Sequence, residues 1–176
     1  MPTASRTAPF DIVLSLRLLQ PAGTLVQLAE ELSVVPSQVH ASLVRLARAG
    51  LLRPNARATN ARALGEFVIH GVRYAFPAQR GELTVGVPTA YSAPPLSSDF
   101  DATDVLVWAA PRHAGAVQGF SVVPLYPGAI TLAERSPATY LLVAMVDALR
   151  IGDPRVRLVA RQRLERALGL RGDDGA

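Results

Sequence analysis

The sequence contains no cysteine and no lysine, and only 6% of its residues are aromatic. The absence of cysteine excludes a disulfide framework, a thiolate zinc site and a cysteine nucleophile. No apolar run approaches the roughly 20 residues that a membrane-spanning helix needs, and the first residues lack the apolar segment of a signal peptide. We therefore expect a soluble, cytoplasmic protein without a membrane partner.

The composition is that of a folded protein, because 49% of the 176 residues are apolar and 18% are charged. All 18 basic residues are arginines and the net charge is +4, but the charges are unevenly distributed. Residues 33–80 carry seven arginines and the single acid Glu66, residues 81–149 carry two arginines and six acids, and residues 150–176 carry seven arginines and four acids. This pattern predicts separate tasks for a basic front, an acidic middle and a basic tail.

Apolar spacing and stop signals predict three helices in the first part of the chain. The second begins after a capping box, in which Thr24 and Gln27 each satisfy a backbone amide of the other. The third begins with a proline, which suits the first helical position, and ends before Gly50. The predicted ranges are Phe10 to Leu19, Leu25 to Leu32 and Pro36 to Ala49.

The middle of the chain changes from helical to extended patterns. A fourth helix is expected from Asn60 to Gly71, and Val72 to Phe76 is predicted to be a short extended exit. Between residues 81 and 127, frequent prolines and glycines separate short apolar runs, which predicts short strands such as Val105 to Trp108 and Phe120 to Val123.

Two further helices are expected near the C-terminus, over Ala138 to Leu149 and, after the cap Asp153, over Pro154 to Leu168. The elements together predict an α+β protein with two parts. Residues 1–76 form a helix-turn-helix domain for DNA binding, and residues 77–176 form a small α+β domain with short strands and two terminal helices. The core of this second domain is expected to contain Trp108, Phe120, Tyr126 and Tyr140.

Residues 25–49 have the spacing of a helix-turn-helix, whose second helix lies in the major groove of DNA. On that helix, Gln38 can pair with an adenine edge, Ser37 and His40 can donate to bases or phosphates, and Arg45 can take a guanine or a phosphate. Later arginines are expected to contact phosphates, which position a protein without reading sequence. The predicted DNA-binding residues are Ser37, Gln38, His40, Ala41, Arg45, Arg48, Arg53, Arg57 and Arg62.

The stretches LAEELSVVPSQV, from Leu28 to Val39, and LARAGLL, from Leu46 to Leu52, resemble the helix-turn-helix of bacterial winged-helix regulators, the MarR-like and related families. The resemblance covers residues 10–54. It implies a transcriptional regulator that binds double-stranded DNA, with Pro36 to Ala49 as the recognition helix. Because such proteins commonly use two half-sites, we expect a homodimer.

Two features depart from that pattern. Val35 stands where these families usually have a serine or threonine cap. No β-hairpin wing is evident after Leu52, because Arg53 to Ala63 is rich in arginine, asparagine and alanine without strand alternation. This segment is a basic arm, a degenerate wing or the start of a helix.

Four strings in the rest of the chain are similar to a group of bacterial helix-turn-helix proteins, some of them encoded beside nucleotidyltransferase-like toxins. The strings are His70 to Pro77, Gly86 to Ala90, Pro124 to Pro127 and Val146 to Arg150. This resemblance implies an alternative function, an antitoxin-like protein that binds and neutralises a toxin-like partner and autoregulates its operon. A third interpretation is a ligand-sensing module whose central region holds a small molecule that changes DNA affinity.

No residue pattern predicts catalysis. His40, His70 and His113 have no metal-ligand spacing, and the three carboxylates in the run Ser98 to Asp104 lack the glycine and distal glutamate of a calcium loop. A phosphate-binding loop and a Gly-x-Ser-x-Gly nucleophile turn are absent from the sequence. We expect no enzyme activity, no metal and no cofactor.

Overall fold

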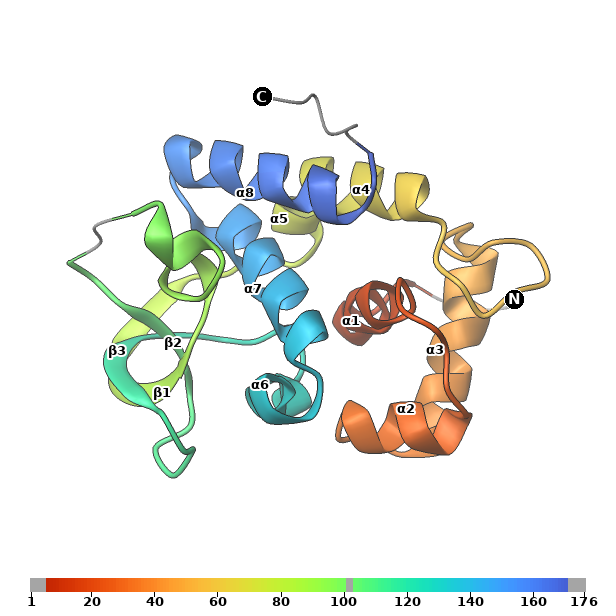
Figure 1. Ribbon diagram of the computed structural model, residues 1–176, viewed down its shortest axis with the longest axis horizontal. Coiled ribbons are helices and arrows are strands. Elements are labelled where there is room, and N and C mark those ends of the chain that lie inside the picture. Colours follow the sequence, from red (N-terminus) through yellow and green to blue (C-terminus); the bar gives the residue numbers. More distant parts are fainter. Residues whose placement is uncertain (1–5, 101–102, 171–176) are drawn as a thin grey trace.

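A computed structural model describes residues 6–100 and 103–170 and shows an α+β fold. Helices α1 to α3 lie at one end of the molecule and three strands lie at the other, with α6 and α7 between them (Figure 1). Helices α4, α5 and α8 lie along one side of this arrangement (Figure 1).

The N-terminal helices are close to their predicted ranges. They are α1 (Pro9–Arg17), α2 (Leu25–Glu31), α3 (Pro36–Arg48) and α4 (Ala61–His70). The prediction of an extended exit at residues 72–76 is wrong, because Val72–Ala75 forms the short helix α5. Val72 is buried while the three residues after it are exposed, a burial pattern that suits a helical turn and not an alternating strand.

The second half holds the three strands β1 (Arg80–Pro88), β2 (Leu106–Ala109) and β3 (Val117–Val122). The two strands expected near residues 105 and 120 are confirmed. The short 3-10 turns η1 (Ala90–Ser92), η2 (Leu96–Ser98) and η3 (Pro127–Thr131) lie between these elements. After them come α6 (Leu132–Arg135), α7 (Pro137–Ile151) and α8 (Pro154–Ala167).

Each strand pairs with the other two, so the sheet closes on itself. β1 is antiparallel to β2, with Val87 opposite Trp108, and antiparallel to β3, with Thr84 opposite Gly119, while β2 and β3 are parallel. Gly86 permits this closure, because a Cβ atom there would lie 1.9 Å from the carbonyl oxygen of Trp108.

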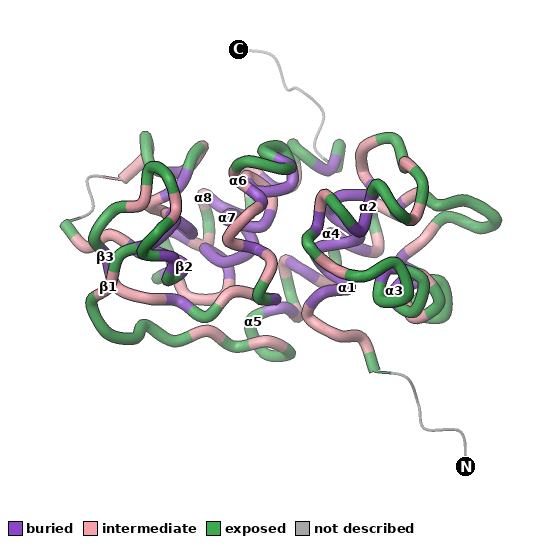
Figure 2. The backbone as a smooth tube through the Cα atoms, turned by 90° about the horizontal axis from the view of Figure 1, so that it is seen from below, coloured by how far each residue is buried: buried purple, intermediate pink, exposed green. Residues whose placement is uncertain are grey.

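Two buried helices organise the core. Every residue of α1 from Phe10 to Arg17 is buried, and α7 buries most of its residues between Thr139 and Leu149 (Figure 2). The buried apolar side chains form one continuous cluster that includes Phe10 and Leu168. None of the helices within the described residues is both long and apolar enough to cross a membrane.

A buried polar network joins α7 to the strands. The Asp147 carboxylate accepts hydrogen bonds from Trp108 Nε1 at 2.7 Å and Thr89 Oγ1 at 2.8 Å, and it pairs with Arg150. Arg150 also donates to the carbonyl oxygen of Phe76 at 2.8 Å. Burial raises the pKa of the Asp147 carboxyl, and its donors act in the opposite direction by favouring the charged form.

We expect Asp147→Ala to lower the free energy of unfolding by about 3–5 kcal/mol, because it leaves Arg150 without its buried counter-charge. Urea denaturation of the full chain measures this loss. Glu66→Ala is the control, because its ion pair with Arg62 is exposed and contributes little. Equal stability of the two variants would show that the buried network does not hold α7 to the strands.

Candidate nucleic-acid interface

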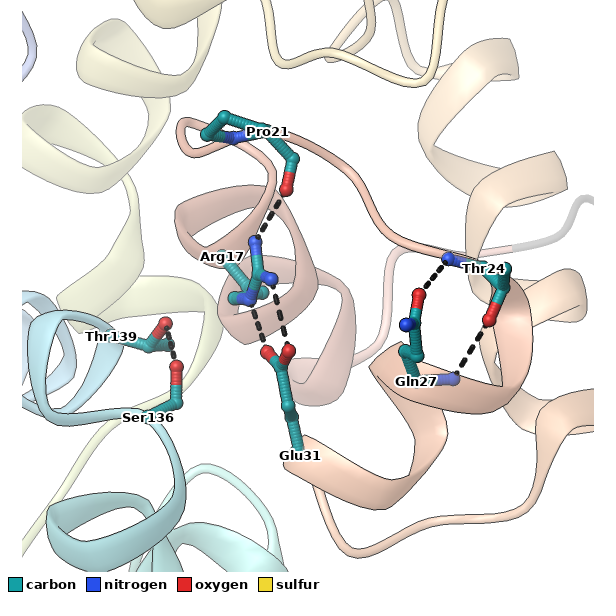
Figure 3. Close-up of polar contacts among 7 residues, drawn as sticks. All are labelled: Arg17, Pro21, Thr24, Gln27, Glu31, Ser136 and Thr139. Atoms are coloured by element: carbon teal, nitrogen blue, oxygen red, sulfur yellow. Dashed lines mark hydrogen bonds and ion pairs between the residues drawn. The ribbon is translucent and has the colours of Figure 1, made fainter.

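The helix α2 and the turn after it have the predicted local structure. Thr24 N donates to Gln27 Oε1 at 2.8 Å, and Gln27 N donates to Thr24 Oγ1 at 3.1 Å, so the capping box is confirmed (Figure 3). Ser33, at φ 55°, ends α2 in the left-handed region, and Val34 N then donates to the carbonyl oxygen of Ala29 at 2.9 Å. This is the hydrogen bond of a Schellman motif, which fixes the direction in which the chain enters α3.

The N-terminus of α3 has the features that the sequence suggests. Val35 caps the helix without a side-chain hydrogen bond, and Pro36 is the first helical residue. At the other end, Gly50 has φ 71° and allows Leu51 N to donate to the carbonyl oxygen of Leu46 at 3.0 Å. The left-handed glycine therefore ends α3 sharply.

Helix α1 holds α3 through a buried carboxylate. Asp11 is fully buried and accepts two hydrogen bonds from Arg45, from Nε at 2.8 Å and from Nη2 at 2.6 Å. Ser42 Oγ also donates to Asp11 at 2.6 Å, and the backbone N–H of Ala8 donates at 2.7 Å. The hydrogen bond to Asp11 raises the pKa of Arg45, because it favours the charged form of the guanidinium.

A second ion pair joins α1 to α2, and here the basic residue is on α1 and the acidic residue is on α2. The Arg17 guanidinium donates to both carboxylate oxygens of Glu31, at 2.5 and 3.1 Å, and to the carbonyl oxygen of Pro21 at 3.2 Å (Figure 3). The buried α1 therefore positions both α2 and α3, with a basic residue toward α2 and an acidic residue toward α3.

The outer face of α3 is exposed and lies at the end of the molecule away from the strands (Figures 1 and 2). No residue of α3 is acidic. Val44, which is 37% exposed, lies on this face and was not among the predicted contacts. The exposed side chains of α3 are those of Pro36, Ser37, Gln38, His40, Ala41, Val44, Ala47 and Arg48.

The segment after α3 forms a small loop at the same end of the molecule. Leu52 and Thr59 make an isolated antiparallel bridge, and Arg53 N donates to the carbonyl oxygen of Ala58 at 2.8 Å. Thr59 Oγ1 donates to the carbonyl oxygen of Ser15, which ties the loop to α1. A single bridge is all the pairing here, so the described residues contain no regular two-stranded wing.

The arginines of this loop and of α4 are exposed. Arg53 and Arg48 have no side-chain partner within the described ranges, while Arg57 donates to the carbonyl oxygen of Gly23 at 3.4 Å. Arg62 lies 3.7 Å from Glu66 in an exposed ion pair. These four guanidinium groups are accessible to an anionic partner.

Arg45 has a different environment from the other predicted DNA contacts. Its side chain is only 21% exposed and its guanidinium is committed to Asp11. In this arrangement the Arg45 guanidinium is not available to contact a base. The sequence carried a signal for this pairing, because Asp11 is the one charged residue among the apolar residues 10–14.

The other sequence candidates are dispersed or paired. Asp99 pairs with Arg163 and Asp104 pairs with Arg80, each at 2.6 Å, while Asp101 lies outside the described residues. His113 Nε2 lies 3.3 Å from Glu134, and the described part of the chain contains no cluster of three or more residues that could hold a metal ion.

Comparisons of this chain with protein-family models, with curated proteins and with solved structures found no match. Any function proposed for this chain therefore rests on the geometry and charge of the residues described above.

We expect Arg45→Ala to lower the free energy of unfolding by about 3–5 kcal/mol, because Asp11 is then buried without its counter-charge. Arg48→Ala, on the exposed side of the same helix, is the matched control and should change stability little. Urea denaturation compares the two. An Arg45→Ala protein as stable as Arg48→Ala, but with altered DNA sequence preference, would restore Arg45 as a base-reading residue.

Proposed function

We propose that this protein is a sequence-specific DNA-binding transcriptional regulator and that α3 is its recognition helix. The observation that carries the proposal is that α1 fixes α2 and α3 with two ion pairs while the outer face of α3 is exposed and free of carboxylates. Its 13 residues make a helix about 20 Å long, which fits the major groove of B-form DNA.

The chemistry of the exposed face favours A·T base pairs. Gln38 has the amide that pairs with an adenine edge, and the methyl groups of Ala41 and Val44 suit the thymine methyl group. Arg45, which the sequence suggested as a contact to guanine, is hydrogen-bonded to Asp11. Among the exposed residues of α3 the one remaining guanidinium is that of Arg48, in the last turn, where it suits a phosphate.

The loop and the start of α4 supply the electrostatic part of the interface. Arg53, Arg57 and Arg62 are exposed. The loop and the start of α4, which carry them, lie at the same end of the molecule as α3 (Figure 1). Phosphate contacts by arginines give affinity and register without sequence information. We include a homodimer in the proposal, since two recognition helices on two half-sites give the usual geometry of such regulators.

We expect Arg53→Ala to weaken binding to specific and random DNA equally and to make the salt dependence of the logarithm of affinity shallower by about one unit. Fluorescence anisotropy with the DNA upstream of the protein's own gene, and with a shuffled fragment, measures both effects at two salt concentrations. Arg112→Ala is the matched control, an exposed arginine in the loop between β2 and β3. Identical behaviour of the two variants would contradict a phosphate contact at Arg53.

We expect selection from a random duplex library to yield sites rich in A·T pairs at the positions that α3 contacts. Gln38→Ala should reduce discrimination at one adenine by about 1–3 kcal/mol, and Val44→Ser should reduce the preference for a neighbouring thymine. Arg48→Ala is the control, because it should weaken all sequences alike. Selected sites with G·C pairs at these positions would contradict the assigned readers, and the absence of any selected site would contradict DNA binding.

A further inference from the structure

A groove between α5 and α8 has apolar and basic walls. It encloses about 310 Å³, and its lining includes the buried side chains of Val72 and Leu149. It continues toward the C-terminal end of α8, where a second hollow shares Ile69, His70 and Arg161 with it. The groove therefore follows the line along which α4 and α5 meet α8.

Two large apolar side chains of this groove are exposed to solvent. Tyr74 is 74% exposed and Leu158 is 56% exposed, although both line the same hollow. Single exposed apolar residues are common on protein surfaces, whereas here two large ones line the same groove.

The charged side chains that line the first hollow have one sign, whereas Glu66 and Glu165 line the second hollow beyond it. Arg73, Arg157 and Arg161 contribute to the lining, which includes no carboxylate among the described residues. Arg161 is paired with Glu165, but Arg73 lies over the Tyr74 ring at 4.9 Å and Arg157 donates only to a backbone carbonyl. Two guanidinium groups therefore remain without an acidic partner beside the exposed tyrosine and leucine.

We propose that the α5–α8 groove, defined by Tyr74, Leu158, Arg73 and Arg157, binds an acidic segment of a partner protein. An apolar side chain of that segment lies between Tyr74 and Leu158, and its carboxylates accept hydrogen bonds from Arg73 and Arg157. Tyrosine and arginine are the residues that dominate the energetics of protein interfaces.

Charge and chemistry favour this occupant over two others. A second copy docked by the same face would bring like charges together, because a two-fold contact places the same surface on both sides. Duplex DNA would use the arginines but has no group that requires the exposed Leu158. The groove is formed by α5 and α8, whereas the proposed DNA contacts are on α3, the loop after it and the first turn of α4 (Figure 1).

The test uses the full chain and two fluorescein-labelled amphipathic peptides, one of leucine and glutamate and one of leucine and lysine. We expect the glutamate peptide to bind and the lysine peptide to bind at least about tenfold more weakly. Tyr74→Ser and Arg73→Glu should each weaken the glutamate peptide about tenfold or more, as expected for interface residues of these types.

Matched controls separate the groove from general surface effects. Val123→Ser removes an apolar side chain of the same 74% exposure as Tyr74, at the residue after β3. Arg166→Glu makes the same charge reversal as Arg73→Glu, at an exposed position of α8 outside the groove lining. Neither should change peptide binding. Equal binding of both peptides, absence of binding at millimolar peptide, displacement of the peptide by random duplex DNA, or self-association that Leu158→Ser abolishes would each overturn the proposal.

Discussion

The complete burial of α1 is the constraint on which the rest of the N-terminal structure depends. A helix with no exposed side still carries two charges, Asp11 and Arg17, and each would be costly without a counter-charge. Arg45 of α3 and Glu31 of α2 provide the two counter-charges. The two ion pairs join α1 to different helices, so they fix α2 and α3 relative to α1 and determine which face of α3 is exposed.

Helices α1 and α7 also connect α2 and α3 to the strands. α1 packs against α7, and α7 reaches the strands through the hydrogen bond of Asp147 with Trp108. Phe10 of α1 also meets Tyr126, the residue before η3, with ring centroids 5.2 Å apart. Two surface contacts make a second connection between these parts of the chain. Ser33 Oγ lies 2.8 Å from Thr131 Oγ1, and Arg135 donates to the carbonyl oxygen of Glu30. The end of α2 and the turn after it are thus in contact with η3 and α6.

Local signals predicted the helices well, whereas pairings across the chain could not be predicted. The capping box at Thr24, the proline at the start of α3 and the glycine after it act within a few residues, so the sequence alone locates these helix ends. The pairing of Asp11 with Arg45 joins residues 34 apart, and periodicity on α3 cannot say whether Arg45 faces solvent or a buried acid. The number of arginines between residues 33 and 80 therefore overstates how basic the surface is. Arg45 is paired with Asp11, and Arg80 is paired with Asp104.

The helix α4 links the two surfaces for which we propose partners. Arg62 lies in its first turn, at the end of the molecule that α3 occupies, and Ile69 lies near its last turn, beside the α5–α8 groove. Leu64 and Val68 are fully buried, so α4 is fixed to the core between these two points. A partner in the groove and DNA on α3 can therefore bind the same chain at once. Binding of the groove partner would change the affinity for DNA only if α4 could adopt two positions and each ligand bound one of these positions more tightly than the other.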